Sequence, residues 1–153
     1  TLDFYNNSKI QFFCSWDIWK HTHTNMELYG DMGSIILPDP NFFSGDILIS
    51  YKNNGWKKID NNKMHLGTPN KTDNDGNKIA NYRGIGLSDM INSIANNTDF
   101  RCSLELSLHI LEVMESIIIS ANDNKQVNII TKPKQPNPLN DDEILSLKRK
   151  YKN

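Results

Sequence analysis

The sequence predicts an α+β fold: a mostly antiparallel open sheet of about six strands, with two helices packed on one face. Two observations lead to this prediction. Short runs of β-branched and aromatic residues, separated by Gly, Pro and Asn, fill most of residues 1–59. Two longer runs with apolar residues at helical spacing follow residue 86. Because the strands precede the helices instead of alternating with them, sequential strands are expected to pair as antiparallel hairpins.

Size and charge bound the classes of function. The chain of 153 residues fits one domain, and its formal net charge is −1. A pI near 6.4 offers no basic surface for nucleic acid or for an anionic membrane. No apolar run reaches membrane-spanning length, and no signal-peptide pattern opens the chain. These features favour a cytoplasmic protein with no nucleic-acid and no membrane partner.

Two further features concern the chain as a whole. Cys14 and Cys102 lie in apolar contexts, which predicts buried free thiols of a reducing compartment rather than a disulfide. Residues 1–5 are already strand-like and lack an initiator Met. We therefore expect the chain to be a piece of a longer protein.

The first predicted hairpin joins residues 1–5 to residues 9–19. In its second strand, the even positions share one face and are expected to form a core under the helices: Ile10, Phe12, Cys14, Trp16 and Ile18. The opposite face carries Phe13 and Trp19, and Tyr29 and Leu48 alternate in the same sense on later strands. This apolar open face predicts a contact surface, such as the interface of a homo-oligomer.

Two more hairpins are expected. Residues 27–29 and 34–37 flank a turn in which Gly30, Asp31 and Gly33 would supply positive φ. Pro38 and Pro40 then end the strand. Residues 46–50 and 56–59 form the third pair, and the polar residues 60–80 predict a long irregular loop.

Helical periodicity covers residues 87–97 and residues 103–121, with Ser103 as the N-cap of the second helix. That helix is apolar except for a narrow polar stripe: Glu105, His109, Glu112, Ser116 and Ser120. An i, i+4 pair between Glu105 and His109 is expected. Residues 127–131 predict a last strand, and the Pro-rich residues 132–139 an extended segment. Asn140 can cap a short final helix, with acidic residues in its first turn and basic residues near its end.

Three local patterns could carry chemistry, and each is weak. His21 and His23 are spaced i, i+2, but no neighbouring Cys, Asp or Glu completes a metal site. Residues 73–77 lack the sixth-position Gly and the closing Glu of a calcium loop. Residues 84–89 resemble a dinucleotide fingerprint, but Asp89 replaces its third Gly. From the residues alone, the prediction ends at a soluble α+β domain.

Four ordered blocks carry a resemblance to a known family. They are residues 15–21 (SWDIWKH), 27–45 (ELYGDMGSIILPDPNFFSG), 81–90 (NYRGIGLSDM) and 105–114 (ELSLHILEVM). Over roughly residues 1–139, the chain resembles the C-terminal domain of the Gfo/Idh/MocA oxidoreductases, which include glucose–fructose oxidoreductase and inositol dehydrogenase. Residues 140–153 would be a short C-terminal helix or tail.

The resemblance implies a function that the residues alone do not. In this family, an N-terminal Rossmann domain holds NAD or NADP and a catalytic Lys in an EKP-like motif. The C-terminal domain shapes the site for a sugar, cyclitol or related polyol and forms the oligomer interface. This chain has neither the EKP motif nor the Gly-rich fingerprint, so it is expected to be inactive and to bind no cofactor by itself.

The resemblance also implies a substrate edge, because polar groups at strand ends and helix starts often contact ligands. The residues expected there are Trp19, His21, His23, Tyr82 and Arg83. A solvated loop is the alternative interpretation of the two histidines. For the whole chain, the alternative is a stand-alone, non-catalytic binding or interaction module with the same fold.

Overall fold

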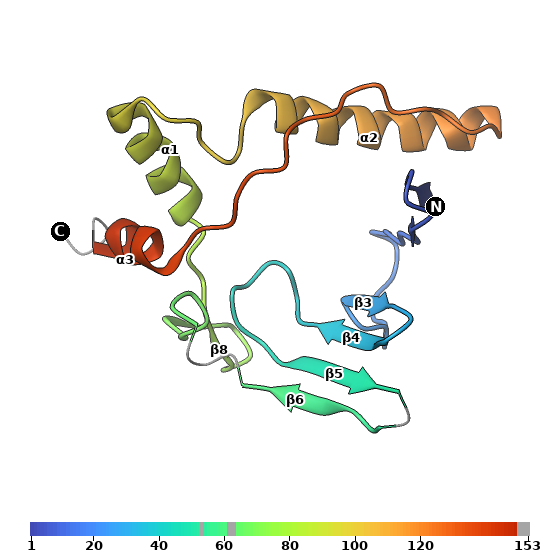
Figure 1. The fold of residues 1–153 in the computed structure, drawn as a ribbon. Helices are drawn as coiled ribbons and strands as arrows, with labels where there is room; N and C mark the ends of the chain where they lie inside the picture. The colour runs from blue at the N-terminus through green and yellow to red at the C-terminus, as the bar shows by residue number, and fades with distance from the viewer. Residues whose placement is uncertain (53, 61–63, 150–153) are drawn as a thin grey trace.

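The computed structural model describes residues 1–52, 54–60 and 64–149. Within them, strands and helices occur in the α+β arrangement that the sequence predicts (Figure 1). The strands form three separate antiparallel sheets, of two, four and two strands. The largest sheet therefore has four strands, fewer than the six expected, because the strands at both ends of this region pair only within their own short hairpins.

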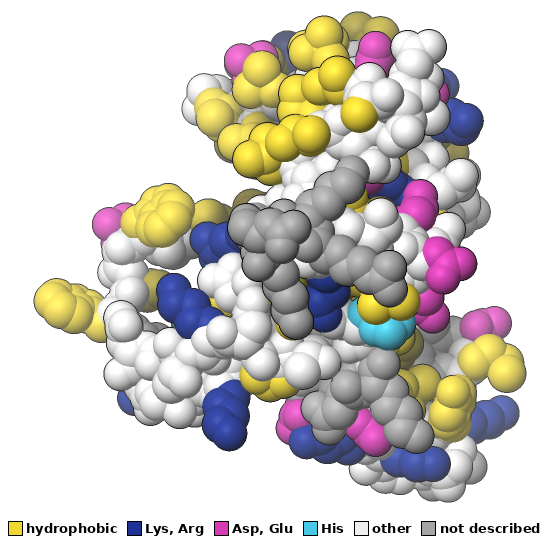
Figure 2. Space-filling view, turned by 90° about the vertical axis from the view of Figure 1, so that its left-hand side faces the viewer, with side chains coloured by type: hydrophobic (Ala, Val, Ile, Leu, Met, Phe, Trp, Pro, Cys, Tyr) yellow, Lys and Arg dark blue, Asp and Glu magenta, His cyan; other side chains and the backbone are white. Residues whose placement is uncertain are grey.

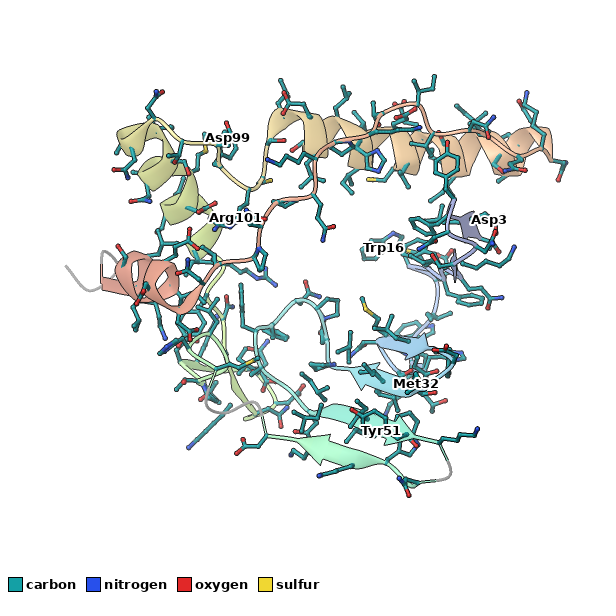
Figure 3. All side chains as sticks on the ribbon, in the orientation of Figure 1. Asp3, Trp16, Met32, Tyr51, Asp99 and Arg101 are labelled. Atoms are coloured by element: carbon teal, nitrogen blue, oxygen red, sulfur yellow. The ribbon has the colours of Figure 1, made fainter. Side chains whose placement is uncertain are left out.

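The first hairpin is much shorter than predicted. Strand β1 (Leu2–Asp3) pairs with β2 (Lys9–Ile10). Residues 11–19 are not a strand, and the whole stretch is exposed. Figure 3 shows Trp16 projecting from this segment. The expected helix-covered core of residues 10–18 is thus wrong: the alternating pattern is present, but no neighbouring strand provides hydrogen-bond partners for it.

The four-stranded sheet consists of β3 (Met26–Tyr29), β4 (Gly33–Leu37), β5 (Ile47–Tyr51) and β6 (Lys57–Ile59). The strands follow one another in space as they do in sequence. All pairs are antiparallel, and Ile35 lies opposite both Leu28 and Ile49. Both predicted hairpins of this region are confirmed within one or two residues.

The register separates two faces of this sheet, because residues paired across antiparallel strands point to the same side. One side, which we call the apolar face, carries Met26, Leu28, Gly33, Ile35, Leu37, Ile47, Ile49, Tyr51, Lys57 and Ile59. The other side, the mixed face, carries Glu27, Tyr29, Ser34, Ile36, Leu48, Ser50 and Lys58. Tyr29 and Leu48 share the mixed face, as their alternation predicted. Phe13 and Trp19 lie outside the sheet.

The glycines of the first large hairpin act differently from the prediction. The turn is closed by the N–H of Gly30, which donates to the carbonyl of Gly33 at 2.9 Å. None of Gly30, Asp31 and Gly33 has positive φ. A Cβ on Gly33 would instead lie 2.4 Å from the Ser50 carbonyl oxygen. The glycine is required there by close strand approach, while positive φ occurs at Gly45 (128°) after the turn.

Residues 60–80 contain a hairpin where a long irregular loop was expected. Strands β7 (Lys71–Thr72) and β8 (Lys78–Ile79) pair antiparallel. The Asp73 carboxylate accepts the N–H groups of Asp75 at 2.9 Å and Asn77 at 2.8 Å. The Asp/Asn-rich stretch thus organises a turn, which side-chain-to-backbone bonds of this kind favour.

Helices α1 (Ile85–Asn96) and α3 (Asp141–Arg149) pack against each other. Leu147 of α3 is only 2% exposed, and Ala80 and Ile85 are also buried. The small core therefore lies at the α1–α3 contact and at Ala80, the residue that follows β8 in the chain. Asn140 caps α3 as predicted: its Oδ1 accepts the Glu143 N–H, and the Glu143 carboxylate accepts the Asn140 N–H, both at 2.9 Å. Residues 150–153, including Lys150 of the predicted basic end, lie outside the described part.

Helix α2 (Leu104–Asp123) begins at the predicted cap, where Ser103 Oγ accepts the Leu106 N–H at 3.2 Å. Its polar stripe faces the segment that follows the helix. The Glu112 carboxylate accepts the N–H groups of Ile130 at 2.7 Å and Thr131 at 2.9 Å. His109 Nδ1 lies 2.8 Å from Thr131 Oγ1, so the expected pairing of His109 with Glu105 is wrong. Residues 127–131 form no strand, and the N–H groups of Ile130 and Thr131 are bonded to the Glu112 side chain of α2 instead of to another strand.

The helices do not cover the four-stranded sheet. No helix reaches a strand of the described residues at contact distance, and Figure 1 shows α2 and this sheet at opposite ends of the structure. Hydrophobic side chains gather at the surface on the level of α1 and α2 (Figure 2). Cys14 and Cys102 are exposed free thiols, which corrects their predicted burial. The helices and the four-stranded sheet are thus both formed, but the apolar side chains of one do not pack against those of the other.

Candidate functional site

Two of the four family-like blocks meet at a corner formed by residues 38–45 and 80–83. The N–H of Phe43 donates to the Ala80 carbonyl at 2.9 Å, and the N–H of Ala80 donates to Ser44 Oγ at 2.8 Å. A Cβ on Gly45 would lie 2.3 Å from Pro38 Cβ, so only glycine fits beside the proline. The Pro and Gly positions of the first block therefore shape the surface on which the second block lies.

Tyr82 lies in this corner with three partners. Its ring meets Phe43 edge-on at 6.0 Å between centroids. Its hydroxyl donates to the Thr68 carbonyl at 2.9 Å. The Lys148 ammonium lies 4.6 Å from the centroid of its ring, a distance at which a cation is attracted to the ring face. Tyr82 is thereby fixed in orientation and half-buried.

Arg83 follows Tyr82 and remains exposed. Its Nη2 lies 3.5 Å from Asn41 Oδ1, at the long limit of a hydrogen bond. The Asn41 N–H in turn donates to Asp39 Oδ1 at 2.8 Å. A guanidinium held this loosely retains donors that can bind hydroxyl or carboxylate oxygens of a ligand.

The other three predicted site residues lie elsewhere. Trp19 is fully exposed, and the rings of His21 and His23 stack with centroids 6.2 Å apart. Near them, the Glu27 carboxylate accepts hydrogen bonds from the hydroxyls of Thr24 and Tyr29. These bonds, Thr24 first, lower the pKa of Glu27. No hydrogen bond, ion pair or ring contact joins Trp19 or the two histidines to Tyr82 or Arg83 within the described residues. The structure thus divides the predicted site into two parts.

A cleft of about 650 Å³ lies beside the corner. Its lining is mixed: charged residues such as Asp39, Asp46, Lys58 and Asp73 alternate with apolar ones such as Phe42, Ile59 and Ile79. Lys58 Nζ is already paired with Asp46 Oδ1 at 2.6 Å, and Asp73 organises its own turn. Charged groups of both signs beside apolar side chains suit a neutral ligand that carries both hydroxyl and C–H groups.

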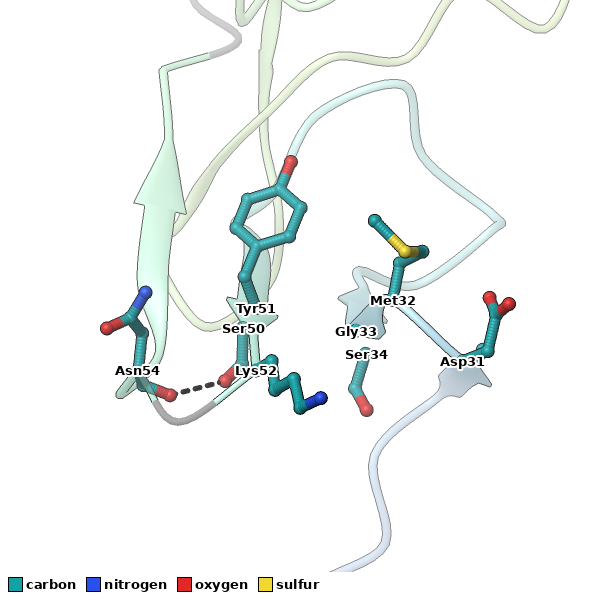
Figure 4. Close-up of a pocket in the computed structure, with 9 residues that line it drawn as sticks. Asp31, Met32, Gly33, Ser34, Ser50, Tyr51, Lys52 and Asn54 are labelled. Atoms are coloured by element: carbon teal, nitrogen blue, oxygen red, sulfur yellow. Dashed lines mark hydrogen bonds between the residues drawn. The ribbon is translucent and has the colours of Figure 1, made fainter.

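A smaller hollow of about 310 Å³ lies at the turn ends of β3–β4 and β5–β6. Figure 4 shows Tyr51 and Met32 on one side of it and the Ser34 hydroxyl on the other. The hydroxyl of Ser50 donates to the Asn54 carbonyl at 2.7 Å and closes the second turn. The hollow is wide open to solvent, and the Ser50 hydroxyl is already bonded within the turn. The hollow is therefore a poorer ligand site than the cleft.

The most strongly connected ion-pair network was missed by the sequence analysis. Arg101 Nη1 lies 2.6 Å from Asp89 Oδ1, and Arg101 Nη2 lies 2.9 Å from both Glu143 carboxylate oxygens. Arg101 Nε also donates to the Asn137 carbonyl at 2.8 Å. The carboxylates, Glu143 first, raise the pKa of Arg101. A single Arg between two helices is the only signal in the sequence, and its partners lie 12 and 42 residues away. The network joins α1 to α3 and is structural.

Hydrogen bonding also stabilises the charged form of Glu112. The Thr131 hydroxyl and then the N–H groups of Ile130 and Thr131 lower its pKa. Because both carboxylate oxygens are occupied, Glu112 is unsuited to the role of a general base. Within residues 1–52, 54–60 and 64–149, no three His, Cys, Asp or Glu side chains are grouped closely enough to hold a metal ion. None of the helices described there combines the length and apolarity needed to cross a membrane.

The corner of residues 38–45 and 80–83 is therefore the best-supported candidate site of this chain. It combines a fixed aromatic ring, a loosely held guanidinium and an adjacent cleft with a mixed lining. Comparison of the chain with protein-family models, with curated proteins and with solved structures finds no match.

Proposed function

We propose that the chain is the C-terminal substrate-binding and oligomerisation domain of an NAD(P)-dependent oxidoreductase of the Gfo/Idh/MocA type. Its substrate would be a sugar, a cyclitol or a related polyol. The observation that carries the proposal is the contact between Asn41 and Arg83. It brings together two sequence blocks that each resemble the family, through residues that lie 42 positions apart.

The chemistry of the corner supports a polyol. Arg83 can donate to several substrate hydroxyls, and the fixed ring of Tyr82 offers an apolar surface against which C–H groups can pack. The neighbouring cleft offers acceptors such as the Asp39 carboxylate. Trp19, His21 and His23 would contribute from the opposite side once the N-terminal domain of the parent protein orders their segment. In such an assembly this chain positions the substrate and carries no catalytic residue.

The residues present do not fit a dinucleotide. Asp89, where the fingerprint has its third Gly, is buried and bonded to Arg101 at 2.6 Å. A carboxylate at that position repels a pyrophosphate, and the segment before it is not a buried strand. We therefore assign NAD or NADP to the Rossmann domain of the parent protein, which would also supply the catalytic Lys.

The partner surfaces follow from the same proposal. The Rossmann domain would cover the N-terminal segment, and the mixed face of the sheet, with Tyr29 and Leu48, would form the homo-oligomer. Phe13 and Trp19 could join this interface if their segment extends the sheet. The proposed location is the cytoplasm.

Ligand titration of the isotopically labelled chain tests the proposal. Millimolar myo-inositol or glucose is expected to shift the amide signals of Tyr82 and Arg83, and the Arg83→Gln variant to lose the effect. NAD(H) and NADP(H) are expected to leave the melting temperature unchanged, whereas a ligand at a hundred times its dissociation constant would stabilise the protein by about 2.7 kcal/mol.

Two results would count against the proposal. Clear stabilisation by either cofactor would contradict the assignment of the cofactor to another domain. The reading frame around the gene decides between a domain and a stand-alone module. An upstream Rossmann-coding region of about 120–200 residues, a common domain size, supports the enzyme domain, and a start codon next to Thr1 supports the module.

A further inference from the structure

Helix α2 exposes an apolar surface that nothing in the described part of the chain covers. Its polar stripe is bonded to residues 130 and 131, so the remaining arc faces outward. Eight side chains of this α2 arc are exposed: Leu104, Leu108, Ile110, Leu111, Met114, Ile117, Ile118 and Ile119. At 100° per residue they span about 200° of the helix. An apolar surface of this extent marks an interaction site.

The apolar face of the sheet is the complementary surface in the same chain. Eight of its ten residues are apolar, and neither α1, α2 nor α3 contacts it. A helix packed on a sheet is the usual way in which such surfaces are buried together. The α2 arc and the apolar face of the sheet could therefore bury each other's apolar side chains.

Contacts within the chain fix the segment that precedes α2. Arg101, three residues before α2, is bonded to Asp89 of α1 and Glu143 of α3. At the other end of α3, the Lys148 ammonium donates to the His65 carbonyl and lies over the Tyr82 ring. Closure of α2 on its own sheet would have to bend the chain at residues 102 and 103 or break these contacts, whereas docking on another molecule leaves the conformation of the chain unchanged.

We propose that α2 of one molecule docks on the apolar face of the sheet of a second copy, and that the exchange is reciprocal. The dimensions allow most of the helix to dock. A 20-residue helix is about 30 Å long and about 10 Å across. The strands have four, five, five and three residues, so at about 3.4 Å per residue and about 4.8 Å between strands the sheet measures at most about 17 Å by 19 Å. The helix laid along its diagonal of about 25 Å extends beyond the sheet by about one turn. Two reciprocal contacts would together bury on the order of 1,200 Å², the lower end of stable interfaces.

A pair of opposite charges would fix how α2 is aligned along the sheet of the second copy. Glu115 is the one charged residue within the α2 arc, and Lys57 is the one charged residue on the apolar face of the described sheet. Their signs are opposite, and neither side chain has a hydrogen bond or ion pair within the described residues. The proposed dimer pairs Glu115 of each copy with Lys57 of the other. This inference does not depend on the proposed enzymatic function.

Sedimentation of the full chain tests the exchange. The wild type is expected to dimerise, and Glu115→Lys and Lys57→Glu are each expected to weaken the dimer about tenfold. The double variant should restore most of the affinity, because the pair is re-formed with inverted charge. A concentration-independent monomer, or a double variant as weak as the sum of its parts, would overturn the proposal.

Matched isoleucine variants locate the interface. Ile118→Gln on the α2 arc is expected to weaken the dimer at least tenfold, whereas Ile130→Gln, more exposed than Ile118 but outside the arc, should leave it unchanged. On the sheet, Ile49→Gln removes a side chain from the apolar face and Ile36→Gln one from the mixed face. Ile36 and Ile49 are both half-buried. The two substitutions should therefore lower the free energy of unfolding, measured by circular dichroism, by similar amounts.

The two sheet variants, Ile49→Gln and Ile36→Gln, also distinguish this exchange from an oligomer formed through the mixed face of the sheet. Loss of the dimer in Ile49→Gln alone supports the exchange. Loss in Ile36→Gln alone overturns it and supports an interface on the mixed face. Cysteine cross-linking of Met114→Cys to Ile49→Cys, with Cys14 and Cys102 replaced by Ser, adds a direct readout. In a mixture of heavy and light chains, links between the two isotopes are expected. Links within single chains only would show that α2 closes on its own sheet and would overturn the proposal.

Discussion

Arg101 and Glu143 are joined by two hydrogen bonds, with Arg101 Nη2 at 2.9 Å from each carboxylate oxygen. The two residues lie 42 positions apart and connect the start of α2 to the start of α3. Glu143 also caps α3 through the Asn140 N–H. One carboxylate therefore fixes both the position of the helix and the conformation of its first turn.

We predict that Arg101→Gln destabilises the α1–α3 unit by about 2 kcal/mol, because it leaves the buried Asp89 carboxylate without its charged partner. The value lies below that of a fully buried pair, since the Arg101 side chain is 26% exposed. Denaturant unfolding followed by helical circular dichroism measures the change. The control is Lys9→Gln, which breaks the exposed pair with Asp3 and should cost less than about 1 kcal/mol. Equal effects of the two variants would contradict a structural role for Arg101.

The Glu143 carboxylate should make stability depend on pH. The Asn140 N–H and then Arg101 lower its folded-state pKa below the ordinary value of 4.5. The stabilisation is therefore fully present above pH 4.5 and is lost as the pH falls through the lower folded-state pKa. Glu143→Gln should unfold earlier than wild type at pH 7, and the difference should shrink towards pH 3. Asp142→Asn, one residue earlier in the helix, should show little difference at either pH. A stability difference between Glu143→Gln and wild type that stays constant from pH 7 to pH 3 would refute the role of the charged Glu143 carboxylate.

Gly33→Ala should loosen the pairing of β4 with β5. The added Cβ would lie 2.4 Å from the Ser50 carbonyl oxygen, so a strand must shift, at a cost of about 1–3 kcal/mol. Gly55→Ala is the matched control, because a Cβ there meets nothing within 4 Å. The control should be neutral or stabilising by up to about 1 kcal/mol. Hydrogen exchange of the Ile35 and Ile49 amides reports the effect, and unchanged protection in Gly33→Ala would show that the close approach is not limiting.

Testing the predicted substrate residues requires kinetics of the proposed parent enzyme. Trp19→Ala, His21→Ala and Arg83→Ala should lower kcat/KM and leave cofactor binding nearly unchanged, because the substitutions remove contacts to substrate alone. Tyr82→Ala and His23→Ala should have smaller effects. Trp56→Ala, another exposed tryptophan outside the family-like blocks, serves as the control. Normal kinetics in all five site variants would show that the substrate lies elsewhere.

The sequence by itself determined those elements whose contacts are local. The β3–β4 and β5–β6 hairpins could be predicted because alternating apolar residues are joined by short turns. The caps at Ser103 and Asn140 could be predicted because each bonds an N–H group three residues later. Neither depends on distant residues.

Only the tertiary structure decided how these elements are used. Residues 11–19 have the alternating apolar pattern of a strand. A strand forms only where the edge of a neighbouring strand supplies hydrogen-bond partners, and the local sequence does not determine whether such a neighbour is present. His109 bonds to Thr131 instead of Glu105 because the segment after α2 runs back along the helix and brings the Thr131 hydroxyl to the imidazole. Arg101 finds its two carboxylates across 12 and 42 residues. The helical period places the α2 arc on one surface, but whether that surface meets a sheet depends on non-local contacts, because apolar burial has no direction of its own.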